Sequence, residues 1–135
     1  MAEVRQPYVH MFTVCDRVLV GSQSGTVTKI IGIRDELMFD EFPAEYPLRV
    51  YARFQGGDGA YKGVLETWWM GPPCERLNSH PFEVEITPDT WLTDRAFRVQ
   101  MTFDRPGFYE FRIAMENCDY VAHPLYVGLC AEPED

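Results

Sequence analysis

Residue types that could perform nucleophilic catalysis occur in this sequence, but their spacing argues against an active site. Ser79 and His80 are adjacent, and neighbours in sequence rarely face each other as a nucleophile and its base must. Cys15 is followed by Asp16, whose negative charge should raise the pKa of the thiol and lower its reactivity. We therefore expect a protein that is not an enzyme.

Three further patterns resemble catalytic or anion-binding motifs only in part. Glu83 and Glu85 share one face of an alternating segment, but their surroundings are typical of a solvated face rather than of an acid–base pair. The segment 56–59 lacks the helix and the lysine of a phosphate loop and predicts a hairpin loop. The segment 21–25 has Gln23 where a hydrolase elbow has serine, which favours a hairpin turn.

Metal ligands are present but poorly spaced. His10 and Cys15 are five residues apart, as are Cys118 and His123, whereas structural zinc usually uses pairs two to four residues apart. An odd separation places two residues of one strand on opposite faces. The sequence predicts no metal site and no cofactor, and leaves open a site that converges from separate strands.

Aromatic and arginine side chains point to binding instead. Trp68 and Trp69 are consecutive on an expected strand, so one must face the core and the other the outside; alternation with Leu65 or with Val64 allows either choice. Arg49, Tyr51 and Arg53 alternate on one strand face. Since Trp, Tyr and Arg dominate interface energetics, we expect these five residues to form an interaction face unless loops cover them.

An alternative site lies in the segment 71–80, which we expect to be a long loop. Its potential ligand groups are Cys74, Glu75, Arg76, Asn78 and His80. Loops of this length are often functional, so the alternative is a small-molecule or metal-binding protein with its site here. A saccharide ranks third, because β-sandwiches with exposed tryptophan often bind sugars.

Composition narrows the choice of partner. The chain of 135 residues has 12 basic and 21 acidic residues, a net charge of −9, which disfavours nucleic acid and anionic membrane as partners. The charge either serves solubility or attracts a basic partner. No stretch approaches the roughly 18 apolar residues of a membrane helix, and the first residues lack the apolar core of a signal peptide. We expect a cytoplasmic protein that binds a protein partner or itself.

Alternation with a period of two dominates the chain and predicts strands. It is clearest in 48–54, 82–86, 97–103 and 109–115, and weaker near 9–20, 26–33, 61–70 and 121–127. Turn residues separate these segments, and one helical turn fits 35–41. The pattern predicts an all-β fold, a two-sheet antiparallel sandwich of seven or eight strands, in a single domain over 1–130 with an acidic, mobile tail over 131–135.

Four cysteines, at positions 15, 74, 118 and 130, could form two disulfides by number. The cytoplasm opposes disulfides, and a strand over 121–127 would place Cys118 and Cys130 at its opposite ends. We expect reduced thiols.

Two resemblances support the architecture. The segment 106–111 resembles the Gly-x-Tyr entry to the penultimate strand of immunoglobulin-like sandwiches, where the Tyr hydroxyl bonds the preceding corner. Phe111 stands where that family often has Cys, which implies apolar packing in place of a disulfide. The segments 15–18, 31–33, 42–44 and 48–53 are similar to a family of small bacterial cytoplasmic proteins of unknown function, a resemblance that implies the same sandwich and no site residues.

Overall fold

The described part of the chain is built from strands alone. A computed structural model describes residues 7–21, 27–86, 92–116 and 118–130, so the expected acidic tail (131–135) lies outside it, as does most of the turn expected at 21–25. None of these ranges contains a helix that could span a membrane. The strands are β1 (Tyr8–Val20), β2 (Val27–Ile33), β3 (Glu36–Phe39), β4 (Ala44–Gln55), β5 (Gly59–Trp69), β6 (Glu75–Ile86), β7 (Leu92–Phe103), β8 (Gly107–Met115) and β9 (Val121–Leu129).

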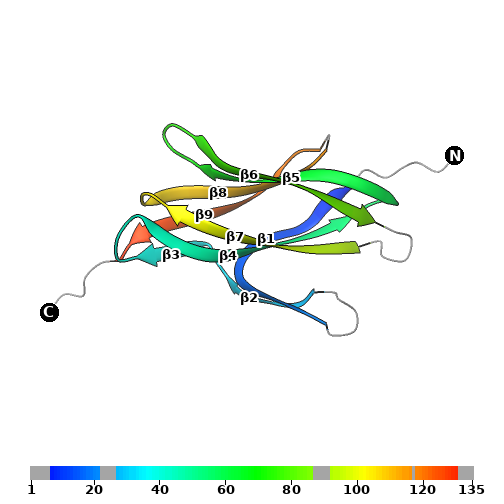
Figure 1. Cartoon of the computed structure of the whole chain (residues 1–135), viewed down its shortest axis with the longest axis horizontal. Coiled ribbons are helices and arrows are strands. Elements are labelled where there is room, and N and C mark those ends of the chain that lie inside the picture. Colours follow the sequence, from blue (N-terminus) through cyan, green and yellow to red (C-terminus); the bar gives the residue numbers. More distant parts are fainter. Residues whose placement is uncertain (1–6, 22–26, 87–91, 117, 131–135) are drawn as a thin grey trace.

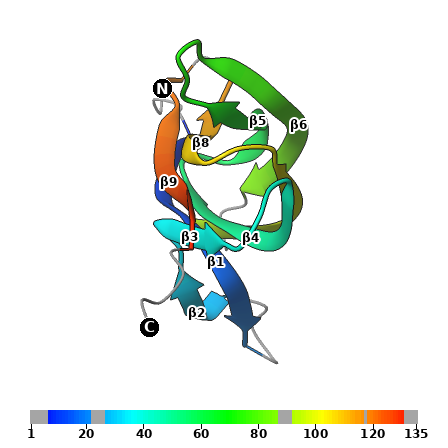
Figure 2. The ribbon, with the colours of Figure 1, turned by 90° about the vertical axis from the view of Figure 1, so that its left-hand side faces the viewer.

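Two sheets pack face to face, which confirms the predicted fold class. One sheet has the strand order β2-β1-β4-β7 and the other β3-β9-β8-β5-β6. Figure 1 shows the two layers one above the other, and Figure 2 shows them from the end. The fold is an immunoglobulin-like β-sandwich, and each of the eight segments predicted to be strands forms one.

Alternating side chains of both sheets form the core. In β4, Leu48, Val50 and Phe54 are fully buried, and in β8 Phe111 and Ile113 are fully buried as well. Burying one such side chain contributes about 1.5–3 kcal/mol to the free energy of folding. The period-two segments therefore determine which face of each sheet turns inward.

The prediction of a helical turn over 35–41 is wrong, because Glu36–Phe39 forms strand β3, in addition to the eight predicted strands. It pairs in parallel with β9, from Glu36 opposite Tyr126 to Phe39 opposite Leu129. Leu37 points into the core and is 5% exposed, whereas Met38 faces outward. Four residues are too few for periodicity to distinguish a strand from a helical turn. This pairing also makes the five-stranded sheet mixed rather than antiparallel throughout.

The glycine-rich segment 56–59 does not close a hairpin as expected. It joins β4 of the four-stranded sheet to β5 of the five-stranded sheet, so it crosses between the layers. Tyr61 donates a hydrogen bond from its hydroxyl to the carbonyl of Gly57 at 2.7 Å, which ties the crossing to the start of β5. Turn residues mark where a strand ends but not which strand pairs next.

The entry to β8 has the predicted tyrosine corner. The hydroxyl of Tyr109 donates to the carbonyl of Arg105 at 2.7 Å. Gly107 adopts a φ of +146°, and a Cβ there would lie 2.4 Å from the ring of Trp69, so only glycine fits. Tyr109 packs edge-on against both Trp69 and Phe103, at 5.1 and 4.9 Å between ring centroids, and thereby joins the corner to the core.

We predict that Tyr109→Phe lowers the free energy of unfolding by about 1 kcal/mol, because it removes one hydrogen bond and keeps the packing. Tyr126→Phe, at an exposed tyrosine of β9, is the matched control and should leave the free energy unchanged. Urea unfolding at neutral pH measures both. Equal stability of Tyr109→Phe and the wild-type protein would show that the corner bond does not stabilise the fold.

Candidate functional site

The face predicted from Arg49, Tyr51 and Arg53 is covered. The second half of β1 and strand β2 form a hairpin that folds back along the outer side of the four-stranded sheet (Figures 1 and 2). Tyr51 does point away from the core, as alternation predicts, but it is only 1% exposed. The prediction that Tyr51 is an exposed contact residue is therefore wrong, and coverage by the hairpin is the physical reason.

Asp94 of β7 fastens this hairpin. Its carboxylate accepts hydrogen bonds from the Tyr51 hydroxyl at 2.8 Å, from Nε of Arg53 at 2.7 Å and from the backbone N–H of Val27 at 3.0 Å. Burial favours the neutral form of Asp94, but these hydrogen bonds outweigh it and lower the pKa of its carboxyl group. Burial and the carboxylate together raise the pKa of Tyr51 to about 12, so its hydroxyl stays a donor.

A second carboxylate, that of Asp16, lies where β1 leaves its pairing with β4 and continues in its pairing with β2. Asp16 accepts a bidentate pair from Arg34, with Nη2 at 2.6 Å, and a hydrogen bond from the hydroxyl of Tyr46 at 2.9 Å. The hydrogen bonds from Arg34 lower the pKa of Asp16. Gly32 has a φ of +71°, and a Cβ there would lie 2.4 Å from Asp16 Oδ2, so the close approach needs glycine. Asp16 and Asp94 thus have structural roles. The sequence hints at these roles only by placing an acidic residue inside a segment that is expected to be a strand.

The two tryptophans divide as expected, one on each side of their strand. Trp69 is the inward residue, 8% exposed, and it belongs to the core beside Tyr109. Trp68 lies on the outer face of the five-stranded sheet. Arg49, Tyr51 and Arg53 belong to the other sheet, so the five residues of the predicted interaction face do not come together.

Around Trp68 the structure assembles a rigid cluster that the sequence did not reveal. The guanidinium carbon of Arg112 lies 4.5 Å from the ring centroid of Trp68 and 4.6 Å from that of Tyr120. Glu110 accepts a hydrogen bond from Nε of Arg112 at 2.6 Å. Stacking and the ion pair together hold Arg112 in place.

More aromatic surface extends along the same face. Phe108 and Tyr126 are cross-strand partners whose ring centroids are 5.1 Å apart, and they are 61% and 38% exposed. Met38 and Tyr126 meet over Gly128, where an added Cβ would lie within 3.0 Å of both side chains. We call Trp68, Phe108, Arg112, Tyr120 and Tyr126 the aromatic face.

Charges on the outer side of the five-stranded sheet are mainly acidic. Its outward positions hold Glu36, Glu66, Glu83, Glu85 and Glu110 against Lys62, Arg76 and Arg112. Arg76 pairs with Glu66 at 3.1 Å, and Arg112 pairs with Glu110. Of the remaining carboxylates, Glu36 lies opposite Tyr126 at the edge of the aromatic face, whereas Glu83 and Glu85 lie toward the other end of β5 from Trp68.

The loop expected over 71–80 is wrong for most of its length. Strand β6 begins at Glu75 and pairs with β5, and only 70–74 form the turn between them. The bulge at Leu77 interrupts the alternation of β6, which is why the sequence pattern did not indicate a strand. Glu75 and Asn78 nevertheless line a cavity of about 540 Å³ that opens between β6 and β7.

The histidine and cysteine side chains of the described ranges are the candidate metal ligands and reactive groups. No group of three or more His, Cys, Asp or Glu side chains there could hold a metal ion. His123 is buried against the chain, with Nε2 at 2.7 Å from the carbonyl oxygen of Arg34. Cys15 is a buried free thiol whose pKa is raised by burial and, as predicted, by Asp16.

Comparisons with known proteins agree with this fold. No protein-family model matches the chain, and no curated protein sequence matches it. The CARDB domain of a Pyrococcus furiosus protein, solved in complex with di-metal ions, has a TM-score of 0.52 at 12% identity, over 96% of this chain and 98% of that chain. A β-glucosidase from Listeria innocua matches with a TM-score of 0.50 at 9% identity, over 92% of this chain but only 16% of the enzyme.

Identities this low show a shared fold and nothing about activity. Membership of the bacterial family that the sequence resembles stays a prediction.

We predict that Asp94→Asn lowers the free energy of unfolding by about 1–3 kcal/mol at neutral pH, since Arg53 and Tyr51 lose a charged acceptor. A carboxyl group whose pKa is lowered on folding stabilises the protein above its ordinary pKa of 3.8, and this contribution is lost as the pH falls through the folded value. The difference between variant and wild type should therefore shrink in acid.

Denaturant unfolding at neutral pH and at about pH 3 measures this difference. Asp40→Asn, at an exposed aspartate, is the control and should match the wild type at both pH values. A gap between Asp94→Asn and wild type that stays constant with pH would contradict the role given to Asp94.

Proposed function

We propose that this chain is a non-enzymatic protein-binding module. Its aromatic face receives one partner, a protein whose contacting surface has an apolar centre and a basic rim. The observation that supports this best is the cluster of the half-buried Trp68 and Arg112 with the exposed Tyr120, on a sheet whose other face is the core. As the sequence predicts, we place this binding in the cytoplasm, with neither nucleic acid nor membrane as partner.

The composition of the aromatic face suits a protein interface. Interface centres are enriched in aromatic side chains, Met and Arg, and a few Trp, Tyr and Arg residues contribute most of the binding energy. Phe108 and Tyr126 extend the apolar area beside the Trp68 cluster. Pro124, between them and Arg112 on the same face, adds a flat apolar position.

The rigidity of the cluster favours binding as well. Arg112 is already stacked between two rings and bonded to Glu110, so little side-chain entropy is lost when a partner docks. Its charge is balanced by Glu110, which lowers the desolvation cost of covering it. The opposite outer face lacks this advantage, because the β1–β2 hairpin covers Tyr51 there.

Charge supports a basic partner. Glu36 lies opposite Tyr126 at the edge of the face, and the whole chain has a net charge of −9. Complementary charges raise association rates and disfavour acidic competitors more than they raise affinity. The interaction should therefore weaken as the salt concentration rises.

The test uses immobilised wild-type protein to capture partners from an extract of the native cell, with quantitative mass spectrometry. We predict that Trp68→Ala and Phe108→Ala/Tyr126→Ala each reduce capture of a basic protein at least about tenfold, since they remove interface anchors. Tyr8→Ala removes a similarly exposed aromatic ring on β1, outside the face, and should capture as the wild type does. Unchanged melting temperatures establish that the variants are folded.

Three outcomes would contradict the proposal. The first is a captured protein that is retained equally by all variants, and the second is capture that high salt leaves unchanged. The third is a wild-type dimer in analytical ultracentrifugation that Trp68→Ala converts to a monomer, which would assign the aromatic face to a second copy of this chain.

A further inference from the structure

A second site lies where the edge strands of the two sheets meet. β6 ends the five-stranded sheet and β7 ends the four-stranded sheet, so both have one side without a strand partner. At one end side chains close this seam: Arg95 donates from Nη1 to the carbonyl of Glu83 at 2.7 Å, and Thr93 donates from Oγ1 to that of Glu85 at 3.1 Å.

At the other end the seam is open. Leu77 is the extra residue of a β-bulge in β6, because Asn78 pairs with Thr67 while Arg76 pairs with Trp68. A bulge bends its strand and redirects its side chains. Asn78, opposite the inward-facing Thr67, points between the sheets, and its Nδ2 lies 4.0 Å from Sδ of Met101 on β7. Here the cavity of about 540 Å³ opens, within the size range of small-molecule sites.

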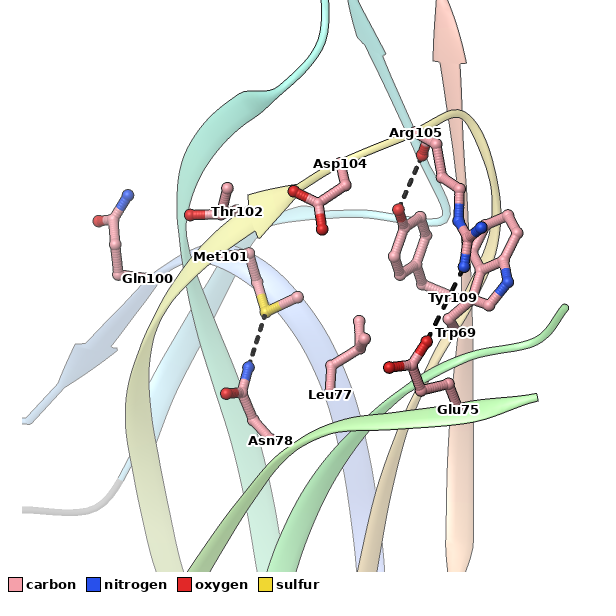
Figure 3. A pocket seen from close by; sticks show the side chains of 10 residues that line it. All are labelled: Trp69, Glu75, Leu77, Asn78, Gln100, Met101, Thr102, Asp104, Arg105 and Tyr109. Carbon is pink, nitrogen blue, oxygen red and sulfur yellow. Dashed lines mark hydrogen bonds and ion pairs between the residues drawn. The ribbon is translucent and has the colours of Figure 1, made fainter. Parts of the chain in front are cut away.

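Rigid groups form one wall of the cavity. The guanidinium carbon of Arg105 lies 4.1 Å from the ring centroid of Trp69, and its Nη2 lies 4.0 Å from Oε2 of Glu75. The hydroxyl of Tyr109 donates a hydrogen bond to the backbone carbonyl of Arg105. Figure 3 shows this wall facing Asp104 and Met101 across the cavity, with Leu77 and Asn78 between them.

The polar groups around the cavity both donate and accept hydrogen bonds. Asp104 and Glu75 offer acceptors, Arg105 offers donors, and the amide of Asn78 offers both.

We infer that this cavity binds a neutral polyhydroxylated molecule, a mono- or disaccharide. A hydroxyl group donates to a carboxylate and accepts from a guanidinium or an amide, so a polyol satisfies every group of the cavity at once. An anion would meet the Asp104 and Glu75 carboxylates, and a cation would meet Arg105, whose charge already faces Glu75. The C–H faces of a sugar ring fit against Leu77 and Met101.

This site is independent of the aromatic face. Trp68 and Trp69 point to opposite sides of β5, so only Trp69 contributes to the cavity. A failure of saccharide binding would leave the proposed protein partner untouched, and the reverse also holds.

The test follows amide resonances of the labelled full chain during addition of glucose, galactose, maltose or cellobiose. We expect at least one sugar to shift the amides of 75–78 and 100–105 with a saturating curve. Asn78→Ala and Asp104→Asn should each weaken binding of that sugar about tenfold, because the first removes an amide and the second replaces a charged acceptor by a neutral amide. Glu83→Gln, on β6 at the closed end of the seam, should bind as the wild type does.

Spermidine and inorganic phosphate are the competing probes, one a cation and one an anion. Shifts of the same amides by either probe, without shifts by any sugar up to about 50 mM, would overturn the assignment to a polyol. Sugar binding that Asn78→Ala and Asp104→Asn leave unchanged, in variants with a wild-type spectrum, would overturn the assignment to this cavity.

Discussion

The buried carboxylate of Asp94 determines which surfaces of this sandwich are open. It accepts hydrogen bonds from three residues of two other strands, Val27 of β2 and Tyr51 and Arg53 of β4, while itself belonging to β7. A charge at this depth is tolerated because each oxygen has charged or polar donors. By holding the hairpin against the four-stranded sheet, Asp94 keeps Tyr51 out of solvent, whereas the aromatic face on the other sheet stays accessible.

The two proposed sites both depend on the difference between the outer faces of the two sheets. The four-stranded sheet covers part of its own outer side with the β1–β2 hairpin, whereas the five-stranded sheet has the core on one side and solvent on the other (Figure 2). Trp68 and Trp69 stand on the two sides of this second sheet, one beside Arg112 and the other beside Arg105. Adjacent residues of one strand thus contribute to the proposed protein-binding face and to the cavity proposed to bind a saccharide.

Much of the fold was predictable, because the alternation of apolar and polar residues along a strand indicates which side chains are buried. The four clear segments and the tyrosine corner needed only local pattern, and the structure has them in place. β3 was missed because four residues specify no period, and the start of β6 because the bulge at Leu77 breaks the period.

The sites were harder to predict, since they depend on contacts between distant segments. Tyr51 alternates correctly, yet nothing near it in sequence indicates that residues 27–33 return to cover it. Arg112 and Tyr120 belong to a strand and a turn some fifty residues after Trp68, so their cluster exists only once β5 and β8 pair. Long-range pairing of this kind leaves no local signature.

The brevity of β3 has a consequence for how these molecules behave at high concentration. A long, flat strand at a sheet margin is a template on which another chain can polymerise by backbone pairing. On the β9 side, β3 pairs with only 126–129, and it enters and leaves this margin by crossing to the other sheet. A parallel strand of four residues offers few free N–H and C=O groups, so β3 itself is a poor template for fibril growth.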